Sequence, residues 1–72
     1  MHEIRAAVAG TIVEVEVDEG QMVAEEDVIV VLDAGANEIV VATEVPGVVR
    51  ELYVQQGDVV AAGAMIALID ES

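Results

Sequence analysis

The clearest pattern along the chain is the alternation of apolar and acidic residues over positions 11–17. Valines at every second position are separated by Glu14 and Glu16. A period of two is typical of a strand with one buried face. A continuous apolar run at 28–32 predicts a second kind of strand, buried on both faces.

Short polar segments that contain glycine separate the apolar runs and predict turns. Further strands are expected at 3–8 and 39–43, the latter returning from the turn after residue 32. The stretch 59–69 has the most helical character, but Gly63 and its β-favouring ends indicate a turn followed by a strand. The pattern therefore predicts an all-β chain.

The second half of the chain repeats the first at an offset of 37 residues. Nine of 27 aligned positions are identical between residues 7–33 and 44–70, and no gap is needed. A repeat of this size suggests two intertwined copies of one β unit, related by a pseudo-two-fold axis. We expect a single domain that spans residues 1–72.

The repeat also predicts two β-bulges. Val13 aligns with Arg50, so this position is expected to be exposed. The positions that are apolar in both halves are spaced first by three residues and then by two, which breaks strict alternation. An extra residue near 13–14, and another near 50–51, would restore the alternation.

The stretch 33–38 lies between two apolar runs and predicts a β-hairpin. Gly35 followed by Ala36 suits a type II′ turn, which has glycine at its first central position. The pseudo-two-fold axis places this hairpin opposite the two chain ends. We expect its tip, residues 34–37, to be the one closed end of the domain.

The charge of the chain is strongly negative. Fifteen Asp and Glu residues stand against Arg5 and Arg50, there is no lysine, and the formal net charge is −13. Such a chain lacks the basic surface that binds nucleic acid, and an anionic membrane surface would repel it. Solvation and repulsion between molecules explain the acidic excess. A halophilic or otherwise acid-biased proteome would also produce it, and a basic partner is an open alternative.

Catalytic and metal-binding patterns are missing from the sequence. Cysteine is absent, which excludes disulfides and thiolate chemistry. His2 is the sole histidine, and we expect it at a frayed end of the chain. The acidic run 25–27 lacks the spacing of a calcium loop and predicts a solvated turn. We expect neither an enzyme nor a metal site.

The apolar runs are too short to span a bilayer as helices, which need roughly 20 residues. No basic and apolar signal-peptide pattern opens the sequence. A cytoplasmic domain is the expectation.

Several segments, spread over nearly the whole chain, together form a pattern known from one family. They are Ala9-Gly10-Thr11-Ile12, Val17-Asp18-Glu19-Gly20-Gln21-Met22-Val23, the tip, Val45-Pro46-Gly47-Val48-Val49 and Val54-Gln55-Gln56-Gly57-Asp58-Val59-Val60. Through these segments the chain resembles the biotinyl/lipoyl attachment domain, a flattened barrel-sandwich hybrid of two four-stranded antiparallel sheets. The length suggests the small stand-alone attachment proteins, similar to biotin carboxyl carriers.

The tip departs from the family pattern at its centre. Biotinyl members typically read Glu-Ala-Met-Lys-Met-Glu, and lipoyl members read Asp-Lys-Ala around the modified lysine. Asp33, Ala34 and Glu38 fit the biotinyl pattern, while Gly35-Ala36-Asn37 replaces Met-Lys-Met. The resemblance thus places Ala36 at the position of the attachment lysine.

The resemblance implies a non-catalytic carrier-type domain in an unmodifiable form, because biotin and lipoate are attached through a lysine amine. Working relatives carry biotin or lipoate, and Glu38 favours biotin. Their partners are carboxylase or acyl-transfer subunits and the ligase that attaches the cofactor. An altered tip and a natural relative that lost the carrier role are both open explanations. The alternative function is a non-carrier interaction module with the same fold.

Overall fold

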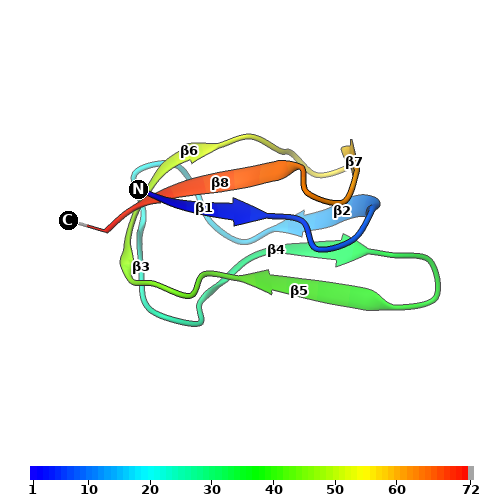
Figure 1. The fold of residues 1–72 in the computed structure, drawn as a ribbon, viewed down its shortest axis with the longest axis horizontal. Helices are drawn as coiled ribbons and strands as arrows, with labels where there is room; N and C mark the ends of the chain where they lie inside the picture. Colours follow the sequence, from blue (N-terminus) through cyan, green and yellow to red (C-terminus); the bar gives the residue numbers. More distant parts are fainter. Residues whose placement is uncertain (72) are drawn as a thin grey trace.

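The computed structural model describes residues 1–71, so the expected domain limit at Ser72 lies outside the described residues. These residues form eight strands and no helix (Figure 1). The strands are β1 (His2–Arg5), β2 (Gly10–Val15), β3 (Met22–Val23), β4 (Val28–Asp33), β5 (Glu38–Ala42), β6 (Gly47–Leu52), β7 (Val59–Val60) and β8 (Met65–Asp70). The described chain thus contains no helix long and apolar enough to cross a membrane.

The strands form two four-stranded antiparallel sheets, which confirms the all-β barrel-sandwich prediction. The first sheet has the order β1-β8-β6-β3 and the second has the order β5-β4-β2-β7. Each strand of one sheet corresponds to a strand of the other at an offset of 37 residues. The two sheets are therefore related by a pseudo-two-fold axis, and each takes strands from both halves of the chain.

Both predicted β-bulges are present. The register shifts between Ile12 and Glu14 where β2 pairs with β4, and between Val49 and Glu51 where β6 pairs with β8. Arg50, the extra residue of the second bulge, is exposed as expected. Val13, the extra residue of the first bulge, is half-buried, so the expectation of exposure was wrong there. Its short apolar side chain can lie against the sheet, whereas a guanidinium stays in water.

The strand limits differ from the expected ones mainly at the N-terminal side. β1 ends at Arg5, where its register with β8 shifts, and residues 7–9 are exposed. β2 ends at Val15 because Glu16 already leaves the ladder, although its N–H still donates to the carbonyl of Ile29 at 2.9 Å. The stretch 59–69 forms β7, a turn and β8, as the sequence predicted.

The core between the sheets consists of small aliphatic side chains. Its buried members are Ile4, Ala6, Ile12, Val17, Val23, Ile29, Val30, Leu32, Val49, Val54, Val60, Ile66, Ala67 and Ile69. No residue of β4 is exposed, in line with the predicted buried strand. Ile29 and Val30 are both fully buried although they are neighbours, because β4 has a bulge in its pairing with β5.

Two glycine turns tie the sheets together in equivalent ways. The N–H of Gly20 donates to the carbonyl of Val49 at 2.7 Å, and the N–H of Gly57 donates to the carbonyl of Ile12 at 2.7 Å. Both glycines have positive φ, +87° and +95°. This left-handed conformation is readily adopted only by glycine, which explains why both halves have glycine here.

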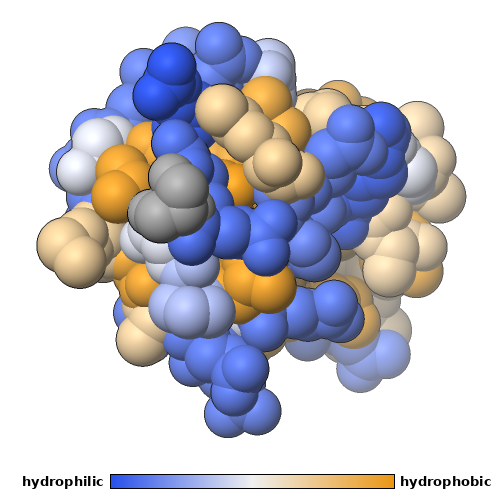
Figure 2. Space-filling model, turned by 60° about the vertical axis from the view of Figure 1, so that its left-hand side comes forward, coloured by the Kyte–Doolittle hydropathy of each residue, from blue (hydrophilic) through white to orange (hydrophobic). Residues whose placement is uncertain are grey.

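The molecule is elongated, with extents of 36 × 18 × 18 Å. The β4–β5 hairpin closes one end, and the two ends of the described chain lie together at the other (Figure 1). The end that carries the chain termini, turned forward in Figure 2, shows hydrophilic residues interleaved with smaller apolar patches. Several acidic residues of the segment 18–27 belong to this end.

Candidate functional site

The tip of the β4–β5 hairpin is a four-residue loop held by one backbone hydrogen bond. Asp33 and Glu38 form the last strand pair, and the N–H of Ala34 donates to the carbonyl of Asn37 at 2.9 Å. Gly35 has a φ of +89°, while Ala36 is outside the positive-φ region. These signs agree with the type II′ turn expected for Gly35 followed by Ala36.

The loop projects into solvent. Residues 35–38 are exposed and Ala34 is half-buried. Nothing lies within 4 Å of the point where a Cβ on Gly35 would stand. All five tip residues that the sequence singled out therefore lie together at one accessible end of the molecule.

The base of the hairpin is mounted on the packed part of the second sheet. Ile12 and Leu32 are paired across β2 and β4 and both are fully buried. Gly10, at the start of β2, packs so closely on the backbone of Asp33 that a side chain would overlap it. The tip is thus an exposed loop on a rigid support.

The electrostatics at the base of the tip were not foreseen from the sequence. Asp33 and Glu38 lie directly opposite one another, so two carboxylates face the same side of the hairpin. Both arginines form ion pairs on the other sheet, Arg5 with Glu3 at 3.0 Å and Arg50 with Asp70 at 3.8 Å. A hairpin with four residues between the two acids could have suggested this contact from the sequence, had the register been known.

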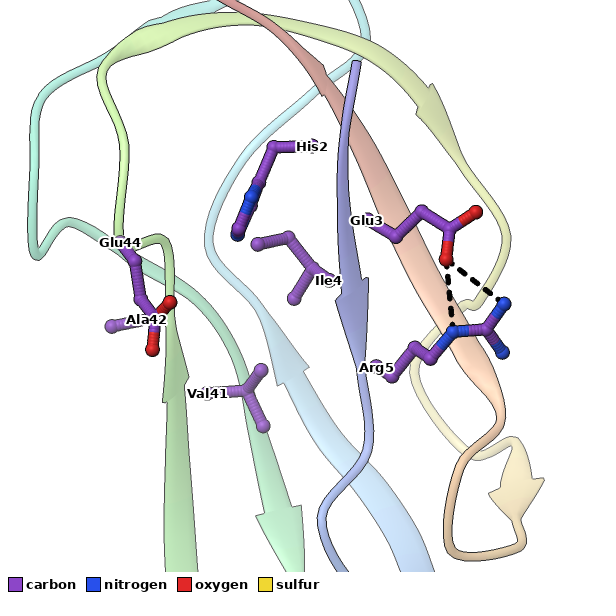
Figure 3. A pocket seen from close by; sticks show the side chains of 7 residues that line it. All are labelled: His2, Glu3, Ile4, Arg5, Val41, Ala42 and Glu44. Atoms are coloured by element: carbon purple, nitrogen blue, oxygen red, sulfur yellow. Dashed lines mark hydrogen bonds and ion pairs between the residues drawn. The ribbon is translucent and has the colours of Figure 1, made fainter.

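A pocket of about 210 Å³ lies at the seam between the edge strands β1 and β5 (Figure 3). His2 and Ile4 of β1 point toward Val41 and Ala42, and Glu3 points away from them. His2 belongs to a paired strand opposite Ile69, so the expectation of a frayed end was wrong. The strand pairing of β1 with β8 orders the chain from residue 2 onward.

The acidic turn 25–27 behaves as the sequence predicted. Its residues are exposed, and the Asp27 carboxylate accepts a hydrogen bond from the N–H of Ala24 at 2.8 Å. This hydrogen bond shows the Asp27 carboxylate stabilising the turn. Within residues 1–71, no three His, Asp or Glu side chains gather closely enough to hold a metal ion.

Two four-stranded sheets related by a pseudo-two-fold axis, with a single exposed hairpin at one end, define the barrel-sandwich class of small domains. Among these, the chain belongs to the Biotin_lipoyl family. The family model, described as "Biotin-requiring enzyme", matches residues 2–69. Domains of this family are carrier domains of enzyme complexes.

A curated relative supports this membership. The chain is 39% identical over 67 residues to a protein of Mycobacterium leprae (strain TN) named "Biotinylated protein TB7.3 homolog". The match covers 93% of this chain and 94% of that protein.

Solved structures of two carboxylases contain a similar domain. The urea carboxylase of Kluyveromyces lactis matches 96% of this chain with a TM-score of 0.89 and 25% identity. A single-chain, multi-domain long-chain acyl-CoA carboxylase matches 92% of it with a TM-score of 0.86 and 32% identity. The chain spans only 6% of the length of each carboxylase.

The same fold occurs in the lipoyl domain of the 2-oxoglutarate dehydrogenase complex from Azotobacter vinelandii. The TM-score is 0.82, the identity is 23%, and the match covers 99% of this chain and 98% of that domain. At this identity the likeness concerns the fold alone.

Proposed function

We propose that this chain is a biotinyl-type carrier domain in a form that cannot be modified at its tip. The observation that carries the proposal is the exposed loop 34–37 on a rigid hairpin, with Ala36 at its centre. The sequence contains no lysine, so no side-chain amine can stand at the tip.

The residues of the tip do not fit a covalently attached cofactor. An amide to biotin or lipoate requires an amine, which attacks the activated carboxyl carbon, displaces the activating group from it and loses a proton. Ala36 offers a methyl group, and the exposed neighbours Gly35 and Asn37 offer no nucleophile. The N-terminal amine of Met1 belongs to the opposite end of the molecule (Figure 1).

Biotin rather than lipoate is the cofactor that we infer for its working relatives. Asp33 and Glu38 border the tip as the paired acids of the biotinyl pattern do. The 39%-identical relative is named a biotinylated protein, and the two carboxylase structures have identities of 25% and 32%. Carboxylase subunits are accordingly the partners that we propose for this fold.

Incubation of the chain with a biotin ligase, biotin and ATP, followed by intact mass measurement, tests the proposal. The mass of the chain should not change. The Ala36→Lys variant keeps Gly35 with its φ of +89°, so it keeps the turn and presents an amine at the tip. This variant should gain the mass of one biotinyl group.

A second variant separates the shape of the loop from its sequence. Gly35→Met combined with Ala36→Lys and Asn37→Met restores the family motif but places a bulky residue at a positive φ, which is strained. If the triple variant were biotinylated and Ala36→Lys were not, the ligase would require the family motif more than the turn that Gly35 forms. Modification of the unchanged chain, or failure of both variants with several ligases, would contradict the proposal.

A further inference from the structure

One row of side chains on the outer face of the β4–β5 hairpin contains an exposed valine beside a half-buried one. Val31 lies directly opposite Val40 on β5 and opposite Glu14 on β2, so the three side chains share one face. Val40 is 57% exposed and Val31 is half-buried. The next residue of β4, Leu32, is fully buried, which confirms that this row faces solvent.

The pseudo-symmetric row of the other sheet shows that the fold does not require valine at position 40. Glu3 occupies the equivalent position, and it pairs across the strands with Leu68, the equivalent of Val31. Glu3 forms an ion pair with Arg5 in that sheet. An exposed strand position of this fold therefore accepts a charged residue, so the strand can form without valine at position 40.

The next row toward the tip is acidic, and the two arginines of the chain pair with acids on the other sheet. Asp33 and Glu38 are directly opposite, an arrangement of like charges that destabilises a sheet. In the other sheet the equivalent of Asp33 is Asp70, which has the guanidinium of Arg50 at 3.8 Å. A partner that supplied lysine or arginine here would relieve the repulsion.

We propose that these two rows form a docking face for a protein partner that presents apolar side chains beside lysine or arginine. The face consists of Val31, Val40, Asp33 and Glu38. A second copy of the chain is a poor occupant, because each copy has a net charge of −13 and would oppose acids to acids. The face lies beside the loop 34–37 and does not depend on whether that loop can be modified.

Two short peptides of equal charge test this docking face. One alternates arginine with valine, and the other alternates arginine with serine. Each peptide is titrated into the isotope-labelled protein, and binding is followed by the chemical shifts of the protein's backbone amides. We expect saturable shifts at β4 and β5, with binding of the valine peptide at least about tenfold tighter, since each buried valine adds apolar contact. Equal affinities, no saturable binding, or shifts centred on the more acidic segment 18–27 would overturn the proposal.

Matched variants separate the face from the overall charge. The fold accepts a residue other than valine at this position, so Val40→Thr should fold, and it should weaken the valine peptide several-fold without any change of charge. Asp33→Asn with Glu38→Gln removes two charges from the face, and Glu16→Gln with Glu25→Gln removes two exposed charges elsewhere. The first pair should weaken binding several-fold more than the second. Equal losses would show attraction by the total charge alone and would refute a defined face.

Discussion

Glu26 and Gly63 occupy equivalent positions in the two halves of the chain, and both adopt a left-handed backbone conformation. Their φ angles are +73° and +85°. The N–H of Glu26 donates to the carbonyl of Thr43 at 2.8 Å, and the N–H of Gly63 donates to the carbonyl of Ala6 at 2.7 Å. Glu26 is the sole residue other than glycine with positive φ in residues 1–71. The fold requires this conformation at both positions and has glycine at only one.

The substitution Glu26→Gly should therefore stabilise the domain. A side chain in the left-handed conformation costs roughly 1–2 kcal/mol, and the greater flexibility of glycine in the unfolded chain offsets about 0.5–1 kcal/mol of the gain. We expect the free energy of unfolding to rise by about 0.5–1 kcal/mol. Urea denaturation followed by circular dichroism measures the change.

The neighbouring residue supplies the control for this prediction. Glu25 is exposed like Glu26 but has no positive φ, so Glu25→Gly removes the same charge without relieving strain. It should lower the stability by about 0.5 kcal/mol or more. If both variants changed the stability equally, the strain at Glu26 would have no energetic consequence.

The close packing of Gly10 on the end of β4 gives a second prediction. A Cβ at residue 10 would overlap the backbone of Asp33 and lie 2.9 Å from Cδ1 of Leu32. Gly10→Ala should destabilise the domain by about 1–3 kcal/mol, because strands β2 and β4 must separate. Hydrogen exchange at the Ala34 amide, which is bonded within the tip, should become faster.

Gly20→Ala is the matched control for that substitution. Gly20 has positive φ, but nothing lies within 4 Å of its added Cβ. This variant should lose about 1–2 kcal/mol through backbone strain alone, with no local change at the Ala34 amide. Identical exchange of that amide in the two variants would argue against a specific contact between Gly10 and the base of the tip.

The fold could be predicted from the sequence to the level of individual bulges because two independent patterns agreed. The period of two identified the strands, and the repeat located the irregular positions where Val13 aligns with Arg50. A single strand pattern would have placed both residues in regular strands. The error at Val13, which is half-buried, arose because the alignment reports what a position tolerates and not how a small apolar side chain packs there.

The candidate site could be predicted only in part. The loop 34–37 follows from local turn chemistry, so its place at the end of a hairpin was foreseen. The carboxylate pair of Asp33 and Glu38 depends on strand register, and the exposure of Val40 depends on which face of β5 meets the core. Both are tertiary properties, and a one-residue change in register would have moved each side chain to the other face.

Tyr53 gives a prediction about titration. Its hydroxyl donates a hydrogen bond to the carboxylate of Glu51. This bond, followed by desolvation and by the negative charges of Glu51, Glu3 and Glu19, raises the pKa of Tyr53 above its usual value near 10. The ultraviolet absorbance of tyrosinate should therefore appear above pH 10, and Glu51→Gln should move its midpoint back toward 10.

The raised pKa of Tyr53 also fixes the sign of its effect on stability. The folded state favours the neutral phenol of Tyr53. The phenol's contribution to the free energy of unfolding is therefore complete below pH 10 and is lost as the pH rises through the higher pKa of the folded state. Glu14→Gln is the control, because Glu14 occupies the position equivalent to Glu51 in the other sheet. Two residues after Glu51 stands Tyr53, whereas two residues after Glu14 stands Glu16. An equal shift of the Tyr53 midpoint in both variants would indicate the total charge and not the hydrogen bond.

The last prediction concerns the opposed carboxylates of Asp33 and Glu38. Glu38→Lys replaces a repulsive cross-strand pair with an attractive one at an exposed position, so the variant should melt roughly 1–4 °C higher at low salt. Salt screens charges over about 8–10 Å near physiological ionic strength, so this advantage should shrink as NaCl is added. The unchanged chain, with a net charge of −13, should itself melt higher in NaCl because its self-repulsion is screened. Glu25→Lys makes the same change of net charge away from any strand pair. The difference between the two rises in Tm measures the contribution of the cross-strand pair at positions 33 and 38. If the melting temperature of the unchanged chain fell steadily as NaCl was raised to molar concentration, the expected relief of self-repulsion would be contradicted. If the advantage of Glu38→Lys did not shrink with NaCl, the attraction across the strands would be contradicted.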